Sequence, residues 1–362
     1  MYRLARIVLF ALPAETAHRL VLWLLGKLSA LPALCRLLRG AGSPPSLATR
    51  VAGLDWPNPV GLAAGLDKDA EAVQALFALG FGAVEVGTLT PRPQAGNPKP
   101  RLFRLEAHRA LINRMGFNNH GALAAAHRLA RLTWRPGPLG INLGKNKDTP
   151  NEVAVDDYVA GVDQLAALGD YVVVNASSPN TPNLRALQDP EALSALLTAV
   201  GDRMSRVVPG KPLFLKIAPD LSPEALDALV DVALDRGIAG IIATNTTITR
   251  ELEDPLAAEA GGLSGAPLKE KSRAVVRRLA ERADGRLAII GVGGIETAED
   301  AYAMLRAGAS AVQIYSSFIY GGPATLKRIL VGLPHLLARD GFTSVEAAVG
   351  ADLRDPSSLG AL

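Results

Sequence analysis

Short, continuous apolar runs alternate with longer helical stretches from about residue 45 onward. Gly/Pro-rich segments separate eight such runs, which lie at 58–63, 82–87, 138–142, 171–175, 213–217, 239–244, 287–292 and 310–315. Because the runs are continuous instead of alternating, they indicate parallel strands covered on both faces. Eight of them, with helix-length connections, predict an α/β fold, the (β/α)8 TIM barrel. An open doubly wound sheet is the alternative, but the early glycine fingerprint G-x-G-x-x-G is missing.

The first 42 residues show a different pattern, with apolar pieces at 7–10 and 20–25 separated by Pro13 and by charged residues. No piece reaches the roughly 18 apolar residues that a spanning helix needs. After Pro13, one helical face collects apolar side chains: Ala17, Leu20, Val21, Leu24 and Leu28, widened by Trp23 and Leu25. The pattern predicts two short amphipathic helices that lie on a membrane surface. Helices packed on the barrel, a signal peptide and a mitochondrial targeting segment are the alternatives.

The composition is that of an ordered globular protein, because 49% of the 362 residues are hydrophobic and 20% are charged. This length is sufficient to bury a large core. The single cysteine, Cys35, excludes an intrachain disulfide framework and a cysteine-based metal site. We therefore expect three parts: an amphipathic helical segment at 1–42 that associates with a membrane, a barrel at 43–340, and a C-terminal tail without an assigned role at 341–362.

Charge is distributed unevenly along the chain. The net charge is only +3, yet residues 1–40 carry six Lys or Arg residues and a single acid, Glu15, which leaves the remainder slightly acidic. A nearly neutral body argues against binding to nucleic acid, which needs a clustered basic surface. The basic start instead favours contact with an anionic membrane surface.

Nearly every predicted strand ends in a polar or glycine-containing cluster, at 65–68, 87–88, 142–144, 175–178, 216–219, 244–247, 291–294 and 315–317. In a barrel these clusters converge on one mouth, where ligands bind. All five histidines fall outside the clusters, which also contain no dense set of carboxylates. Metal-dependent hydrolysis and histidine-based acid–base catalysis are therefore disfavoured. Amides and hydroxyls suit a planar ligand, with a cofactor supplying the chemistry.

The last two clusters are typical of a phosphate cradle, because the glycines at 293–294 permit close backbone approach and the serines at 316–317 can open a helix. A plain tight turn is the alternative. Lys68 and Lys216, each at a strand end, are either salt-bridge partners or charges aimed at an anionic ligand such as a reduced flavin. The segment 113–118 and the glycine-rich 261–265 have the composition of turns or loops.

Taken together, these residues resemble the class 2 dihydroorotate dehydrogenases from about residue 1 to about residue 335. The matching strings are AAGLDKD (63–69), GTLTPRPQAGNPKPRLFRL (87–105), INRMGFNN (112–119), GINLGKNKDTP (140–150), NASSPNTP (175–182), LKIAPDL (215–221), ATNTT (243–247), GGLSG (261–265), IIGVGGI (289–295) and VQIYSSFIY (312–320). So many strings in one order make the resemblance highly specific.

The resemblance implies a role for each matching residue. Those that would contact FMN are Ala64, Gly65, Leu66, Asp67, Lys68, Thr88, Asn142, Asn175, Lys216, Thr244, Gly265, Gly294, Tyr315 and Ser316. Those that would contact dihydroorotate are Lys68, Asn113, Arg114, Met115, Gly116, Phe117, Asn175, Asn180, Asn245 and Thr246. Ser178 matches the catalytic base of the family, and no metal is implied. The loop at 179–190, rich in Pro and Asn, would act as a lid.

The activity implied is oxidation of dihydroorotate to orotate in pyrimidine biosynthesis, with FMN as the bound hydride acceptor and a membrane quinone as the final acceptor. Ser178 would remove the C5 proton and hand it on, with Thr181 as a polar neighbour that could help. The expected location is peripheral, on the cytoplasmic face of a bacterial inner membrane, with the mitochondrial inner membrane as the alternative. A flavin barrel that reduces another pyrimidine and a non-enzymatic membrane scaffold are the competing interpretations.

Overall fold

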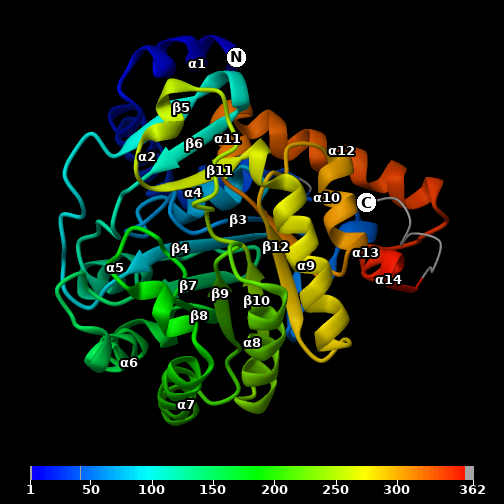
Figure 1. Ribbon diagram of the computed structural model, residues 1–362. Coiled ribbons are helices and arrows are strands. Elements are labelled where there is room, and N and C mark those ends of the chain that lie inside the picture. Colours follow the sequence, from blue (N-terminus) through cyan, green and yellow to red (C-terminus); the bar gives the residue numbers. More distant parts are fainter. Residues whose placement is uncertain (1, 41, 355–362) are drawn as a thin grey trace.

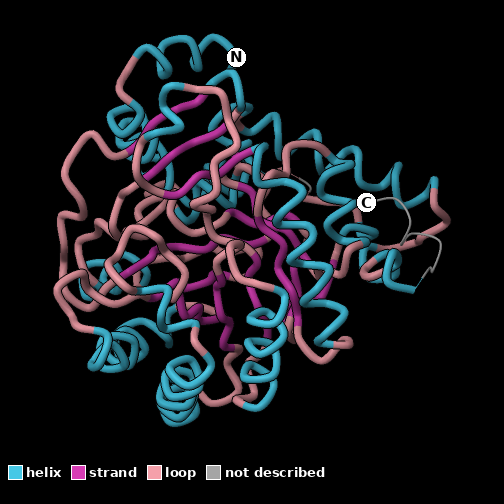
Figure 2. Tube along the Cα trace, in the orientation of Figure 1, coloured by secondary structure: helices cyan, strands magenta, loops and turns pink. Residues whose placement is uncertain are grey.

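Eight parallel strands close into a barrel at the centre of the computed structural model (Figures 1 and 2), which describes residues 2–40 and 42–354. In chain order the strands are β3 (Val60–Leu62), β4 (Ala83–Leu89), β7 (Leu139–Leu143), β8 (Tyr171–Asn175), β9 (Leu213–Ile217), β10 (Gly240–Ala243), β12 (Ala288–Val292) and β13 (Ala311–Ile314). Each coincides with one of the predicted apolar runs, and β13 pairs with β3 to complete the ring. The prediction of a (β/α)8 barrel is confirmed.

Both faces of each barrel strand are buried, which explains why the runs are continuous. In β8, Tyr171 and Val173 belong to the apolar cluster inside the barrel, together with Phe214 of β9. The intervening Val172 and Val174 belong to the larger cluster between the strands and the outer helices. Successive side chains of a strand point to opposite faces, so a strand covered by two apolar layers favours apolar residues at successive positions.

Helices surround the barrel, as Figure 1 shows. They are α4 (Val73–Ala78), α5 (Ala122–Leu129), α6 (Ala154–Leu165), α7 (Pro190–Val207), α8 (Pro223–Asp235), α9 (Lys269–Ala283), α10 (Ala298–Arg306) and α12 (Pro323–Arg339), with the short α11 (Ser316–Gly321) directly after β13. Local signals set their starts: Ser222 accepts a hydrogen bond from the N–H of Ala225 at the start of α8, and Thr297 forms a capping box with Asp300 in α10.

Two small antiparallel sheets lie outside the barrel. The hairpin of β1 (Thr49–Val51) and β2 (Leu54–Trp56) precedes the first barrel strand, and Trp56 joins the inner core. The second sheet consists of β5 (Leu102–Leu105), β6 (Ala110–Asn113) and β11 (Gly262–Gly265). The interpretation of 261–265 as a loop is therefore wrong, because β11 pairs with the distant β6, and no local pattern records a pairing over that separation. Asn113 likewise ends a strand instead of opening a turn.

Three helices, instead of the two predicted, form the start of the chain: α1 (Tyr2–Ala11), α2 (Ala14–Ser29) and α3 (Pro32–Arg39). Pro32 begins the additional helix, a position that proline favours. One side of the segment packs on the barrel, since Leu22 enters the main core and Cys35 is fully buried beside α4. Among the described residues no single helix is long and apolar enough to cross a membrane, and α2 and α3 meet that criterion only as a pair bent by 101°.

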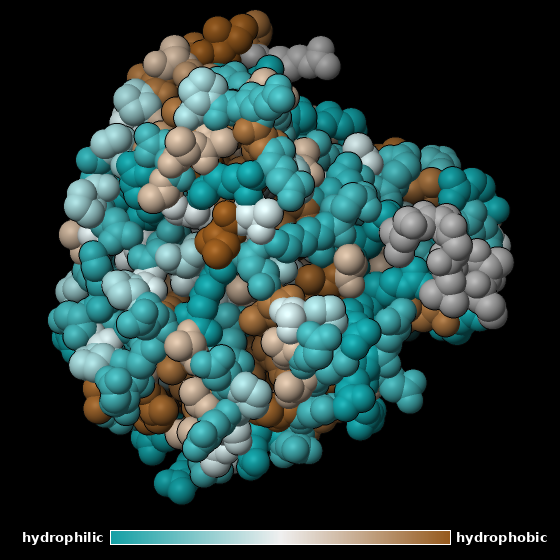
Figure 3. All heavy atoms as spheres, viewed as in Figure 1, coloured by the Kyte–Doolittle hydropathy of each residue, from teal (hydrophilic) through white to brown (hydrophobic). Residues whose placement is uncertain are grey.

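The other side of these helices exposes large apolar side chains: Leu4, Ile7, Val8, Leu20, Trp23, Leu24, Leu31, Leu34, Leu37 and Leu38. Figure 3 shows hydrophobic atoms gathered at the end of the molecule that α1 occupies. The predicted apolar face is divided by the fold, because Ala17 turns inward while Leu20 and Leu24 face outward. Many large apolar side chains exposed on one short segment mark an interaction site.

The predicted C-terminal tail is folded where the structure describes it. It forms α13 (Val345–Ala348) and α14 (Ala351–Arg354), and Val345 is fully buried in the main core. The Asp352 carboxylate pairs with Arg306 of α10 at 2.5 Å. Residues 355–362 of that predicted segment lie outside the described residues.

Candidate active site at the barrel mouth

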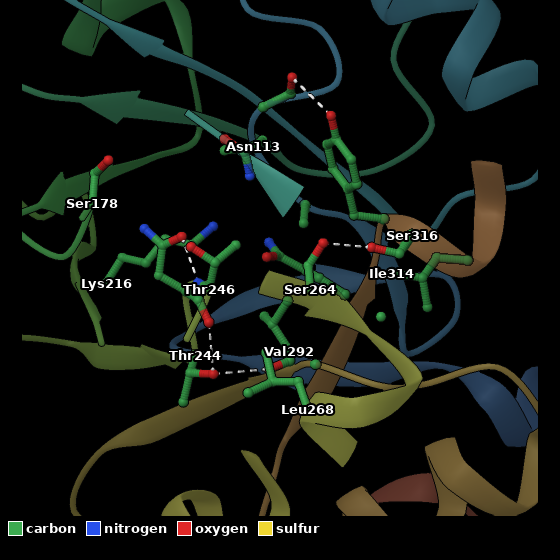
Figure 4. A pocket seen from close by; sticks show the side chains of 18 of the residues that line it. Asn113, Ser178, Lys216, Thr244, Thr246, Ser264, Leu268, Val292, Ile314 and Ser316 are labelled. Atoms are coloured by element: carbon green, nitrogen blue, oxygen red, sulfur yellow. Dashed lines mark hydrogen bonds between the residues drawn. The ribbon is translucent and has the colours of Figure 1, made fainter. Parts of the chain in front are cut away.

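A cavity opens at the carboxyl ends of the barrel strands, where the sequence predicts the ligand site (Figure 4). Its empty space, including the part that is open to solvent, is about 1070 Å³. Figure 4 shows Ser178 and Lys216 on one side of this space, with Ser264 and Ser316 on the other. No histidine lines the cavity in the described part of the chain.

The structure brings most of the predicted site residues to this cavity. The lining includes Ala64, Gly65, Lys68, Thr88, Asn175, Lys216, Thr244, Gly265, Gly294, Tyr315 and Ser316 of the FMN set, Asn113, Met115, Gly116, Phe117, Asn180, Asn245 and Thr246 of the substrate set, and Ser178. These residues come from the carboxyl-terminal ends of seven of the eight barrel strands or the loops that follow them, and from β6, the segment after β6, and β11. The predicted set is therefore distant in sequence and adjacent in space.

Four predicted residues do not line the cavity. Leu66 is buried, and its carbonyl oxygen lies 2.7 Å from Nε2 of His18 in α2. The Asp67 carboxylate accepts hydrogen bonds from the N–H groups of Glu71 and Ala72, although burial raises its pKa to about 6. Arg114 turns away to pair with Glu259 at 2.6 Å. Asn142, the fourth, lies behind the cavity wall.

Asn142 belongs to a buried network of amides and hydroxyls at the ends of β4, β7 and β8. Its Oδ1 accepts a hydrogen bond of 2.6 Å from Thr88 Oγ1, and Asn175 Nδ2 donates to the same Thr88 oxygen at 2.8 Å. Asn175 Oδ1 in turn accepts from Ser177 Oγ at 2.8 Å. Such bonds fix each amide in one orientation, so the polar groups that face the cavity are held before any ligand arrives.

The Lys216 side chain extends from β9 to the cavity and forms an ion pair with Glu85 of β4. The Lys216 Nζ atom lies 3.6 Å from Glu85 Oε1, and the Glu85 side chain is completely buried. Asn142 and Gln313 donate hydrogen bonds to the two Glu85 oxygens, at 2.8 and 2.7 Å. Both alternatives raised for this lysine therefore apply, since it is an ion-pair partner that also faces the cavity. Sequence reasoning missed Glu85 because it lies within an apolar strand.

Lys68 lies at the edge of the cavity, where its Nζ donates a hydrogen bond of 2.7 Å to the Gly65 carbonyl. Burial lowers the pKa of Lys68 to about 8, although the nearby Asp69 carboxylate partly opposes this shift. The ammonium group is thus charged at neutral pH and loses its proton only slightly above it. An anionic ligand bound beside Lys68 would stabilise the protonated form of its amino group.

The opposite wall has the features of a phosphate cradle. Gly293 and Gly294 have φ values of +133° and +68°, which disfavour any side chain, and a β-carbon at Gly294 would lie 2.4 Å from the Lys269 backbone. Ser264 and Ser316 share a hydrogen bond of 2.8 Å between their hydroxyls. Ser317 Oγ and Gln313 Oε1, also at this wall, are buried without a hydrogen-bond partner among the described residues. Buried polar atoms without partners point to a ligand, and a phosphorylated planar cofactor fits them.

Ser178 lies in the loop after β8, almost completely buried. Its Oγ accepts a hydrogen bond of 3.2 Å from the Asn180 N–H, which leaves its own proton free for another acceptor. Thr181 Oγ1, nearby in the same loop, is buried and has no hydrogen-bond partner among the described residues. The loop thus carries the hydroxyls of Ser178, which lines the cavity, and of Thr181.

Several lining residues were not predicted: Ala63, Ser264, Leu268, Val292, Ile295, Glu296, Gln313 and Ile314. Most are apolar, and composition alone does not distinguish them from core. The matched strings AAGLDKD, GGLSG, IIGVGGI and VQIYSSFIY could have indicated six of them: Ala63, Ser264, Val292, Ile295, Gln313 and Ile314.

The family model described as dihydroorotate dehydrogenase matches residues 46–337. The chain belongs to the dihydroorotate dehydrogenase family. The resemblance to its quinone-dependent class is confirmed by curated relatives named dihydroorotate dehydrogenase (quinone). The Myxococcus xanthus protein is 64% identical over 361 residues, 99% of each chain. A Thermus thermophilus protein is 54% identical over 346 residues, 93% of this chain and 97% of the relative.

Solved structures of the dihydroorotate dehydrogenase family have the same fold. The ligand-free enzyme from Eimeria tenella superposes with a TM-score of 0.87 at 44% identity, covering 94% of this chain and all of the other. The Eimeria tenella enzyme in complex with ferulenol gives a TM-score of 0.86 at 42% identity, covering 94% and 96%. Enzymes of this family use a flavin, and the cavity at the barrel mouth is where the chain could hold one.

Proposed function

We propose that this protein oxidises dihydroorotate to orotate in pyrimidine biosynthesis, with FMN as its bound hydride acceptor and a membrane quinone as the final electron acceptor. The observation that carries the proposal is the convergence of the predicted flavin and substrate residues on one cavity around Ser178. Family membership and the relatives named dihydroorotate dehydrogenase (quinone) support the same activity.

FMN would supply the acceptor for the hydride of substrate carbon C6. We assign its phosphate to the cradle of Gly293, Gly294 and Ser316, since backbone approach is open there and Ser317 Oγ nearby needs a partner. Its ring system would lie over the amide network of Asn175 and beside Lys216. That ammonium group can stabilise negative charge on a ring edge because burial strengthens its field.

The proton step falls to Ser178, which lines the cavity. We propose that it removes the proton from substrate carbon C5. A serine hydroxyl is a weak base at neutral pH, so it must pass a proton on as it accepts one. Thr181 Oγ1, buried without a partner in the described residues, supports a relay that leads from Ser178 toward solvent.

Substrate orientation would come from amides on both sides of the cavity. Asn180 Nδ2 donates a hydrogen bond of 3.1 Å to the Asn113 carbonyl, which ties the Ser178 loop to β6. Asn245 Nδ2 bonds Ser177 Oγ at 2.9 Å from the end of β10. These amides can bind the ring edge of a pyrimidine, while Lys68 balances the charge of its carboxylate.

The pH dependence of ligand binding tests the role of Lys68. In the ligand-free protein Lys68 has a pKa of about 8, so above this pH an anion must bring a proton with it. The dissociation constant of orotate should therefore rise by up to about tenfold per pH unit above pH 8. Lys68→Met should bind weakly without this pH dependence, as measured by flavin absorbance changes. Binding by the unsubstituted protein that stays constant from about pH 7 to 9.5 would contradict the assignment.

A second cavity lies between α2 and the barrel and supports a route for the quinone. Its lining includes Leu22 and Trp23 of α2 and Arg101 directly before β5, and it shares Lys68 and Met115 with the first cavity. The exposed apolar side of α1–α3 continues outward from Trp23. We propose that this side rests on a bilayer, with the cytoplasmic face of a bacterial inner membrane as the location.

Substitutions on that side test membrane docking without disturbing the core. Leu37 and Leu38 of α3 are 76% and 55% exposed, so Leu37→Glu with Leu38→Glu should leave folding unchanged. A leucine that enters hydrocarbon contributes roughly 1.5–3 kcal/mol, and we expect partition into anionic liposomes to fall by at least about tenfold. Leu123→Glu, at a 63% exposed position of α5, is the matched control. Equal partition of both variants would contradict docking through α3.

The activity itself is tested by product stoichiometry. Flavin-loaded protein in liposomes, given dihydroorotate and a long-chain quinone, should form one orotate for each quinol, since a hydride and a proton leave the substrate together. Orotate formation with a pyridine nucleotide and not with quinone would contradict the proposed acceptor.

A further inference from the structure

Arg185 lies at the C-terminal end of the loop that carries Ser178, and its side chain binds this loop to neighbouring segments. The guanidinium group of Arg185 donates hydrogen bonds to three neighbouring strand ends: from Nε to the Ser177 carbonyl at 3.1 Å, from Nη2 to the Thr246 carbonyl at 2.9 Å, and from Nη1 to Asp220 Oδ2 at 2.9 Å. These acceptors follow β8, β10 and β9, respectively. One planar group therefore sets the spacing of three segments at the barrel mouth.

Two of the three acceptors adjoin residues of the proposed reaction. Ser177 directly precedes Ser178, and Thr246 is itself at the cavity. The bond from Arg185 to Ser177 also closes the segment 177–185 into a ring. Amide side chains hold this ring as well: Asn180 bonds β6, Asn97 and Asn151 donate to the Asn180 and Asn183 carbonyls, and Asn245 donates to Ser177 Oγ. Arg185 is the charged group among these contacts, and it joins the ring to two other strand ends at once.

Asp220 is a rigid anchor for this contact. Its Oδ1 accepts hydrogen bonds of 2.5 Å from Thr247 Oγ1 and from Lys271 Nζ, and its Oδ2 accepts from the Ile248 N–H at 3.1 Å. Burial alone would raise the pKa of Asp220, but the hydrogen bonds from Lys271, Thr247, Ile248 and Arg185 lower it to about 2. The carboxylate thus stays ionised at any pH at which the protein works. Charge-assisted bonds of this kind are stronger and more directional than neutral ones.

We propose that Arg185, anchored on Asp220, is a positioning residue for the oxidation of dihydroorotate, holding Ser178 at its working distance from the substrate. The inference rests on the proposed function. A misplacement of about 1 Å at a reacting group can cost on the order of 10²-fold in rate. The second cavity contains no residue of the Ser178 loop among the described residues that line it, so reoxidation of the flavin by quinone does not depend on the contact.

The test compares Arg185→Gln, Arg185→Lys and Asp220→Asn with a matched control. Arg278→Gln removes another Arg–Asp contact, in which Nε and Nη2 of Arg278 bond Asp227 at 2.8 and 2.5 Å between the outer helices α9 and α8. Each full-length, FMN-loaded variant is mixed with dihydroorotate under anaerobic conditions, and flavin reduction is followed by stopped flow. Quinone-dependent reoxidation, flavin content and melting temperature are measured on the same samples.

Arg185→Gln should slow flavin reduction at saturating substrate by about 10- to 10²-fold, with a substrate dissociation constant within about threefold of the original. Arg185→Lys should recover part of the rate, since an ammonium group keeps the charge and some of the bonds. Deuterium at C5 of the substrate should slow Arg185→Gln more than the unsubstituted protein, because proton removal is the step impaired. Reoxidation by quinone and the Arg278→Gln control should stay unchanged.

Normal flavin reduction in all three variants would overturn the proposal. So would loss of flavin or of folding in all three, because Arg185 would then stabilise the barrel instead of positioning Ser178. If the unsubstituted protein itself holds FMN that dihydroorotate does not reduce, the proposed function fails, and the positioning role fails with it. The unsubstituted sample therefore separates the two failures.

Discussion

Replacing Ser178 with alanine should leave FMN bound and slow its reduction by dihydroorotate by about 10² to 10⁴, which corresponds to roughly 3–5 kcal/mol of barrier. The reason is that Ser178 Oγ is the hydroxyl at the cavity for which the proton step is proposed, and no histidine lines that cavity among the described residues. Ser178→Cys should recover part of the rate with a pH profile moved toward the thiol pKa. Stopped-flow reduction of the bound flavin measures both.

The competing explanation is that Ser178 only stabilises its turn, by accepting the Asn180 N–H. Ser222→Ala is a matched control for that role, since Ser222 Oγ accepts the Ala225 N–H at the same distance, 3.2 Å, at the start of α8. Losing such a bond costs about 1 kcal/mol of stability in either case. If Ser178→Ala changes the rate of flavin reduction by less than about threefold, as the control should, the base lies elsewhere.

Gly294→Ala should weaken FMN binding by about 10- to 10²-fold. The added β-carbon would lie 2.4–2.5 Å from the Lys269 backbone, and overpacking of this kind typically costs 1–3 kcal/mol. The strain moves the start of α9 or the backbone N–H groups of the cradle, so we expect the loss in cofactor affinity. Fluorescence titration of the flavin-free protein with FMN measures the dissociation constant.

Gly285→Ala is the control for Gly294→Ala. Gly285 has a φ of +72°, almost the same as the +68° of Gly294, but a β-carbon there meets no atom within 4 Å. Both variants share the conformational penalty of a left-handed alanine, roughly 1–2 kcal/mol, and only Gly294→Ala has the clash. Equal FMN affinity in the two variants would contradict the assignment of the cradle.

The barrel could be predicted from the sequence because its signal is local. Each strand, such as β8 with Tyr171 to Asn175, is buried on both faces and so appears as an unbroken apolar run. The sheet of β5, β6 and β11 could not, because β11 contains two glycines and pairs with residues far away in the chain. The sequence also did not show which side of the N-terminal helices packs on the barrel. Leu22 and Leu24 are the same residue type, yet Leu22 is buried and Leu24 is exposed.

The candidate site was predictable where polar residues lie at the carboxyl-terminal ends of strands, as Lys216 and Asn175 do. Its supporting groups were not. Glu85 is a charge inside an apolar strand, and Arg185 and Asp220 are common surface residue types whose partnership crosses three loops. Such contacts depend on the closure of the barrel, which brings distant segments together without leaving a periodic pattern.

If this cavity holds a flavin that dihydroorotate reduces, an absorption spectrum of the purified protein shows it. We expect a yellow protein, with non-covalent FMN approaching one per chain, whose visible flavin bands bleach under anaerobic conditions when dihydroorotate is added and return when quinone follows. A folded, colourless protein that does not take up FMN, or a bound flavin that dihydroorotate leaves oxidised, would contradict it.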